Sequence, residues 1–251
     1  MNKIRISAVK YANTYPFIYG LTEKGFDRIA ILETDHPADC AAKLINGIVD
    51  IGLIPVAILP LMKEYHIISN YCIGADGAVK TVLLLSNSPL NDIQTVYLDY
   101  RSRSSVMLIK VLAKNAWNKE FVWKDTTEGY DFSDIRLNEA AVLIGDQCFE
   151  YEKNFMYKTD LAFEWKKFTG LPFVFACWAA NKELDIDFIG KFNEALKSGV
   201  DNIEDVVERF GSTGVIKGDI LKKYLTENID YNFNDEKKMA LKLFLKLMSE
   251  L

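Results

Sequence analysis

The chain has 251 residues, of which 49% are hydrophobic and 26% are charged. This composition is typical of a folded globular protein and excludes disordered, collagen-like and coiled-coil chains. The 30 basic and 35 acidic residues give a formal net charge of −5. That charge disfavours non-specific nucleic-acid binding, which needs a basic surface. The length fits one large domain or two small ones.

We expect a cytoplasmic protein without a membrane span. The longest apolar stretch, 51–62, contains Pro55 and Pro60 and is shorter than the roughly 20 residues that cross a bilayer. The first residues lack the apolar segment of a signal peptide. Four cysteines without a CxxC pair are expected to be buried, reduced thiols. They are Cys40, Cys72, Cys148 and Cys177.

No motif for a metal or cofactor is found. The two histidines, His36 and His66, do not stand in a metal-binding spacing. Walker, GxGxxG and GxSxG motifs are absent as well. We therefore expect neither a metal nor a cofactor. No general base stands out, so any catalysis here should need little acid–base assistance.

Short apolar runs alternate with helical patterns, which predicts an α/β fold with a largely parallel sheet. In chain order we expect a strand at 4–9, helices beginning near 13 and 37, strands at 49–54, 81–85 and 95–98, a helix at 106–117, a strand at 141–144, a helix at 160–168, a strand at 172–177 and helices from 187 to the end.

Two crossings of the chain divide it into two lobes. We expect the first after Ser86 and the second near 179–181, because polar residues follow strands at both places. The first lobe would comprise 1–86 and 180–251, and the second 87–179. Two α/β lobes with two connections create a cleft, where ligands commonly bind.

The strongest polar cluster is Ser102, Ser104 and Ser105 at a strand-to-helix turn. A helix start offers free N–H groups and the positive end of the helix dipole, so it favours a carboxylate or phosphate. N-capping alone would also explain one serine. Arg101 and Arg103 could bind a carboxylate through two hydrogen bonds, or could simply be solvated.

Polar residues close other expected strands. Asn13 and Thr14 follow the first strand, Ser86 ends another, and Gly145 and Asp146 end a third. Because open α/β sheets bind ligands at strand ends, these groups together indicate one polar cleft.

Seven segments, in order along nearly the whole chain, resemble the chorismate dehydratases of the futalosine route to menaquinone. They are SAVKYANTYPFIYGL (7–21), DIGLIPV (50–56), IGADGAVKTVLLLS (73–86), TVYLDYRSRSSV (95–106), AVLIGDQ (141–147), DLAFEWKKFTGLPFVFACW (160–178) and YLTENIDY (224–231). The resemblance implies a type II periplasmic-binding-protein fold and a hydro-lyase that converts chorismate to 3-[(1-carboxyvinyl)oxy]benzoate.

The resemblance also implies roles for individual residues. Asn13 and Ser86 would contact the substrate near the reacting centre, and Ser104 and Ser105 would bind a carboxylate. The full set expected to bind this small dicarboxylate is Thr14, Arg101, Ser102, Ser104, Ser105, Gly145 and Asp146. No nucleic acid or membrane is expected as a partner, and both a monomer and a homodimer remain open.

The sequence departs from the family pattern beside the expected carboxylate site. Tyr100 and Arg101 replace the usual Thr and Ser, and Ser104 replaces Thr. At the first loop, Lys10 and Ala12 replace Ser and Leu. Two alternatives therefore stay open: a cytoplasmic protein that binds a small carboxylate without converting it, and 1,4-dihydroxy-6-naphthoate synthase.

Overall fold

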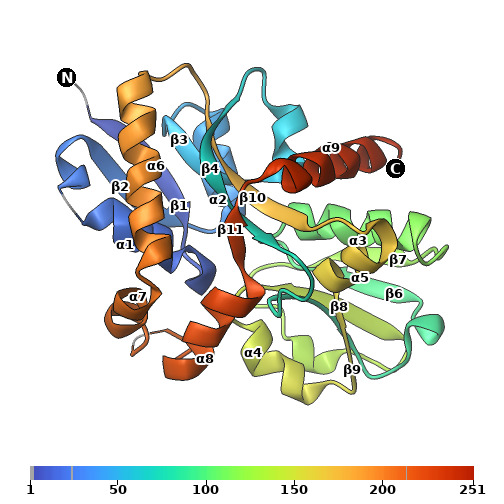
Figure 1. The fold of residues 1–251 in the computed structure, drawn as a ribbon. Helices are drawn as coiled ribbons and strands as arrows, with labels where there is room; N and C mark the ends of the chain where they lie inside the picture. The colour runs from blue at the N-terminus through green and yellow to red at the C-terminus, as the bar shows by residue number, and fades with distance from the viewer. Residues whose placement is uncertain (1–2, 24, 213) are drawn as a thin grey trace.

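A computed structural model describes residues 3–23, 25–212 and 214–251. The chain forms two lobes, each built around one β-sheet with helices packed against it (Figure 1). The strand order is β11-β4-β10-β3-β1-β2 in the first lobe and β7-β6-β8-β5-β9 in the second. The expected two-lobed α/β architecture is confirmed.

The first sheet is mixed. Its strands are β1 (Ile4–Val9), β2 (Ala30–Asp35), β3 (Ile51–Pro55), β4 (His66–Ala75), β10 (Phe173–Ala180) and β11 (Asp230–Asn232). Strand β1 pairs in parallel with β2 and β3, whereas β10 pairs antiparallel with β3 and β4, and β11 antiparallel with β4. Its helical elements are η1 (Ala12–Thr14), α1 (Tyr15–Thr22), η2 (Phe26–Arg28), α2 (Pro37–Ile45), η3 (Val56–Leu61), α6 (Ile186–Asp201), α7 (Ile203–Phe210), α8 (Gly218–Lys223), the π-helical turn η7 (Tyr224–Asn228) and α9 (Asp235–Ser249).

The second sheet is mixed as well. Its strands are β5 (Val82–Ser86), β6 (Thr95–Leu98), β7 (Val122–Asp125), β8 (Glu139–Ile144) and β9 (Tyr157–Asp160). Strand β6 is parallel to β7 and β8, but β5 is antiparallel to β8 and β9. The helical elements are η4 (Leu90–Asp92), α3 (Ser104–Asn115), η5 (Phe132–Asp134), α4 (Cys148–Tyr151), η6 (Glu152–Asn154) and α5 (Leu161–Thr169). The expectation of a largely parallel sheet was wrong, because β10 and β11 in the first sheet and β5 in the second run antiparallel to the strands with which they pair.

Both crossings lie earlier in the chain than expected. Strand β5 pairs with β8 and β9, so the first connection, 76–81, precedes it. Strand β10 pairs with β3 and β4, so the return, 161–172, precedes that strand. The division into 1–86 plus 180–251 and 87–179 therefore assigned β5 and most of β10 to the wrong lobe. Both strands are buried throughout, and their sequences do not show which sheet they join.

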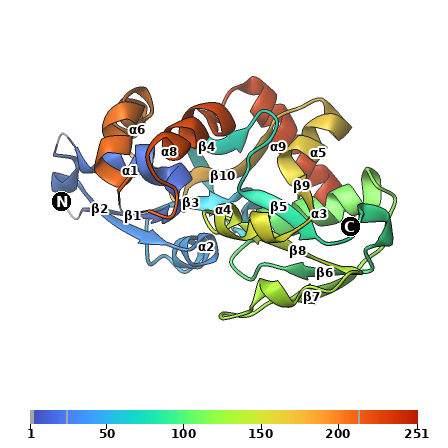
Figure 2. The same cartoon turned by 90° about the horizontal axis from the view of Figure 1, so that it is seen from below.

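The C-terminal part was expected to be entirely helical, but it contains β11. This short strand is fixed to α9 by Lys237, whose side chain is fully buried. The Lys237 Nζ donates hydrogen bonds to the carbonyl oxygens of Asp230 and Asn232, at 2.7 and 2.6 Å. Helix α9 then packs against β10 and against α3 of the second lobe, so it spans the junction between the lobes (Figure 2).

The four cysteines are free and buried, as expected. Within the described parts of the chain, no helix is long and apolar enough to cross a membrane, and no cluster of three or more His, Cys, Asp or Glu could hold a metal ion.

Candidate functional site

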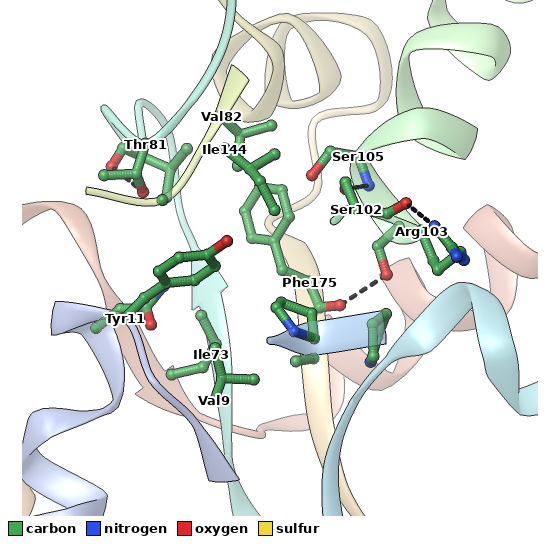
Figure 3. Close-up of a pocket in the computed structure, with 17 residues that line it drawn as sticks. Val9, Tyr11, Ile73, Thr81, Val82, Ser102, Arg103, Ser105, Ile144 and Phe175 are labelled. Carbon is green, nitrogen blue, oxygen red and sulfur yellow. Dashed lines mark hydrogen bonds between the residues drawn. The ribbon is translucent and has the colours of Figure 1, made fainter. Parts of the chain in front are cut away.

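A cavity of about 60 Å³ lies at the junction of the two lobes (Figure 3). Its walls combine aliphatic side chains with hydroxyl groups from both lobes and from the connection between them. The residues that line it are Val9, Tyr11, Asn13, Pro37, Pro55, Ile73, Val79, Thr81, Val82, Ser102, Arg103, Ser104, Ser105, Ile144, Gly145, Phe175 and Ala176. The site therefore includes five of the nine residues expected from the sequence: Asn13, Ser102, Ser104, Ser105 and Gly145.

Tyr11 contributes a phenol group to this cavity. It follows β1, and its ring lies against Gly145 of the second lobe, where a Cβ atom would come within 2.7–2.9 Å of the ring. Gly145 also has a φ of +73°, which residues other than glycine rarely adopt. The Tyr11 hydroxyl is buried and has no hydrogen-bond partner among the described residues. Burial raises its pKa above the usual value, so the group stays protonated and can donate to a ligand.

The start of α3 brings three serines to the cavity in different roles. Ser102 Oγ accepts the N–H of Ser105 at 3.2 Å, which is a helix-capping bond. Ser104 Oγ donates to the Phe175 carbonyl at 2.8 Å and accepts the Ala57 N–H at 3.3 Å. Ser104 therefore joins the second lobe to the first. Ser105 lines the cavity beside the positive end of the helix dipole (Figure 3).

Arg101 is engaged elsewhere. Its guanidinium forms two hydrogen bonds with the fully buried Asp99 carboxylate, at 2.9 and 2.8 Å. Gln147 also donates to Asp99, at 2.8 Å. Arg103 lines the cavity, but its guanidinium donates to the carbonyl oxygens of Tyr100 and Ser102. The two arginines thus stabilise the loop before α3.

Asp146 forms a contact between the lobes and does not line the cavity. Its carboxylate oxygens accept the backbone N–H of Ala12, at 3.1 and 3.2 Å. Burial raises the pKa of Asp146 to about 6, although the hydrogen bond from Ala12 opposes this shift. Asp146 thus connects η1 of the first lobe to the turn after β8.

Asn13 and Thr81 face the cavity from two neighbouring segments. Asn13 Oδ1 accepts the hydroxyl of Thr14, which is fully buried, at 3.1 Å. Thr81 closes the first connection, and its Oγ1 lies 2.8 Å from the hydroxyl of Tyr224. Sequence reasoning missed Thr81, Tyr11 and Tyr224. The segments that carry them were recognised, but their side chains gave no separate signal.

Ser86 lies at the opposite end of β5. Val82 lines the cavity, and an extended strand places Ser86 roughly 13 Å further along. The Ser86 hydroxyl donates to the Ser88 carbonyl at 2.7 Å. Because β5 runs antiparallel to β8, its C-terminal end cannot share an edge with Gly145 and Asp146. The structure therefore does not bring Ser86 together with Asn13.

Solved structures resemble the whole chain at low sequence identity. A protein from Archaeoglobus fulgidus superposes with a TM-score of 0.76 at 17% identity, over 99% of this chain and 97% of the other. A Candida albicans gene product described as having the generic periplasmic-binding-protein fold gives 0.69 at 15% identity, over 100% and 91%. The periplasmic aliphatic sulphonate binding protein of Escherichia coli gives 0.65 at 13%, over 100% and 92%.

Two mixed-sheet lobes, two connections and a cavity at their junction define a member of the periplasmic-binding-protein fold class. Within that class the family is given by the sequence: the model of a menaquinone biosynthesis family matches residues 4–250. The chain belongs to this family. Among curated relatives, the chorismate dehydratase of Thermus thermophilus is 23% identical over 264 residues, which cover 95% of this chain and 93% of the relative.

Proposed function

We propose that this protein is a cytoplasmic enzyme that removes water from chorismate and forms 3-[(1-carboxyvinyl)oxy]benzoate. The observation that carries this proposal is the cavity itself. It places the start of α3, the Ser105 hydroxyl and the unpartnered Tyr11 hydroxyl around one space in a chain of the menaquinone biosynthesis family. The name of the Thermus thermophilus relative supports the same reaction.

The reaction suits a cavity whose lining contains no carboxylate or histidine. A ring C–H bond breaks, its electron pair forms the new ring double bond, and the hydroxyl leaves from the adjacent carbon as water with that proton. The ring carboxylate stabilises the charge that develops, and aromatisation provides the driving force. The protein mainly has to bind two carboxylates and orient the leaving hydroxyl.

Different residues of the cavity would carry out these tasks. The start of α3 and Ser105 would bind one carboxylate, and Tyr11 would donate a hydrogen bond from the opposite lobe. Asn13 and Thr81 would contact the reacting centre, so Thr81 takes the role that the resemblance gave to Ser86. At about 60 Å³ the cavity is smaller than the roughly 300–1,000 Å³ of common ligand pockets. We therefore expect the lobes to separate before the substrate enters.

The test is to incubate the purified protein with chorismate and to follow the product by chromatography and mass spectrometry. The proposal expects loss of one water and an aromatic product. A rise in melting temperature with chorismate but no product would instead support a binding protein, which is the activity named for the Escherichia coli neighbour. If chorismate gave no product and no thermal shift, chorismate would be excluded as the ligand.

A further inference from the structure

Tyr224 connects the two polar groups proposed at the reacting centre. It is the first residue of η7 and is only 1% exposed. Its hydroxyl lies 2.8 Å from Thr81 Oγ1. The segment η7 also contacts η1, and the Asn13 side chain there lowers the pKa of Tyr224 against the larger raising effect of burial. Its ring packs edge-on against Phe149 of the second lobe, with the centroids 5.5 Å apart. A single buried side chain thus contacts the first lobe, the connection and the second lobe.

The available donors define a direction for this chain of hydrogen bonds. Thr14 donates to Asn13 Oδ1, so the Nδ2 group of Asn13 is the part of this amide that can donate toward the neighbouring Tyr224 oxygen. Tyr224 can then give its one proton to Thr81 Oγ1. With Tyr224 as the donor in that pair, the Val79 carbonyl, at 3.5 Å, is the remaining acceptor of the Thr81 proton among the described residues. That distance is too long for a strong hydrogen bond. The Thr81 proton is therefore available to a ligand.

Two further contacts hold the Tyr224 segment in place. Asn228, at the end of η7, donates from Nδ2 to the Ala78 carbonyl in the first connection, at 3.0 Å. The Tyr231 hydroxyl donates to the Asn13 carbonyl at 3.0 Å. A π-helical turn is rare and occurs often at functional sites. Here the end of this turn contacts the first connection through Asn228, and the residues just after it contact the Asn13 loop through Tyr231.

We propose that Tyr224 is a positioning residue: its hydroxyl orients the Asn13 amide and the Thr81 hydroxyl so that Thr81 can direct its proton to the leaving hydroxyl of the substrate. This inference rests on the proposed dehydratase function and deepens it. Tyr224 does not line the cavity, so it acts through Asn13 and Thr81.

The test compares Tyr224→Phe with Tyr97→Phe. Tyr97 is a matched control, because its hydroxyl hydrogen-bonds Glu139 within the second lobe, at 3.2 Å, and Tyr97 does not line the cavity. We expect Tyr224→Phe to lower kcat roughly tenfold, equivalent to about 1.4 kcal/mol, with KM within about twofold. Tyr97→Phe should keep the wild-type kcat.

A double variant separates positioning from general destabilisation. If Tyr224 acts through Thr81, adding Tyr224→Phe to Thr81→Val should lower kcat little beyond Thr81→Val alone. Multiplicative losses, an unchanged kcat in Tyr224→Phe, or a change confined to KM would each overturn the inference.

The two proposals can fail separately. A wild-type protein that forms no product from chorismate contradicts the dehydratase function, whatever Tyr224 does. The positioning role is then decided by crystal structures of the wild type and Tyr224→Phe. The inference expects the Thr81 side chain or the Asn13 amide to reorient in the variant. If both keep their wild-type orientation, Tyr224 does not position them.

Discussion

The backbone N–H of Ala12 donates to both carboxylate oxygens of Asp146, at 3.1 and 3.2 Å, and this contact joins the first lobe to the second. An amide oxygen could accept the same hydrogen bond without a buried charge. The contact therefore permits a neutral replacement that keeps its geometry and separates the effect of the charge from that of the hydrogen bond.

Asp146→Asn should stabilise the protein at neutral pH. Burial raises the pKa of Asp146 from 3.8 to about 6, so between these values the folded state holds more protons than the unfolded state. The carboxyl group thus lowers the free energy of unfolding as pH rises from about 4 to 6, by about 3 kcal/mol at most. Urea unfolding of both proteins at pH 4, 6 and 8 should show a gain for the variant that grows with pH. An equal difference at all three values would contradict the prediction.

Gly145→Ala should destabilise the protein more than Gly170→Ala. Both glycines have left-handed φ angles, +73° and +75°, and each alanine costs about 1–2 kcal/mol on that account. Only at Gly145 does the added Cβ also meet the Tyr11 ring, whereas nothing lies within 4 Å at Gly170. The difference between the two unfolding free energies measures this contact. Equal losses would mean that Tyr11 moves aside at no cost.

Ser104→Ala and Ser105→Ala should have different effects. The first leaves the Phe175 carbonyl and the Ala57 N–H without their buried partner, which should cost about 1–3 kcal/mol of stability. The second removes a hydroxyl that lines the cavity and should raise KM for chorismate with little change in melting temperature. The reverse pattern would assign the carboxylate contact to Ser104.

Arg101→Ser should mainly lower the free energy of unfolding, with a smaller effect on substrate binding. It leaves the fully buried Asp99 without its ion-pair partner, and breaking such a pair costs roughly 3–5 kcal/mol. Adding Asp99→Asn removes the buried charge and should recover part of that loss. A stable Arg101→Ser variant with a raised KM would instead show that Arg101 binds the substrate.

Thr81→Val and Ser86→Ala test which hydroxyl serves the reaction. Thr81 lines the cavity just before β5, and Ser86 lies at the far end of that strand. We expect Thr81→Val to lose at least tenfold in kcat, as removal of a group at the reacting centre commonly does, and Ser86→Ala to retain the wild-type rate. The opposite result would restore the assignment made from the sequence resemblance.

The sequence predicted the elements whose signals are local. The strands at 4–9 and 95–98 have the expected bounds, and the helix expected at 160–168 is found at Leu161–Thr169. Strand β11 was missed because its three residues are ordered by pairing with β4, which lies far away in the chain, and by the burial of Lys237, which its sequence neighbours do not indicate.

The candidate site was predictable only in part for the same reason. Asn13 and the serines at the start of α3 follow strands that could be recognised locally. Ser86 lies away from the cavity because of the direction of β5, which its pairing with β8 and β9 reveals. The position of the Tyr11 ring depends on the space left by Gly145, which lies far along the chain, and no local sequence pattern indicates that contact.

The first connection between the lobes supplies part of the cavity wall, and the strand that follows the second connection supplies another part. Val79 and Thr81 belong to the first connection, and Phe175 lies just beyond the second. Any rotation of one lobe against the other must be absorbed by these two segments, since they are the covalent links between the sheets. A ligand in the cavity therefore lies next to a segment about which the lobes would rotate. Its affinity must vary with the angle between the lobes, so occupancy and closure form a single equilibrium.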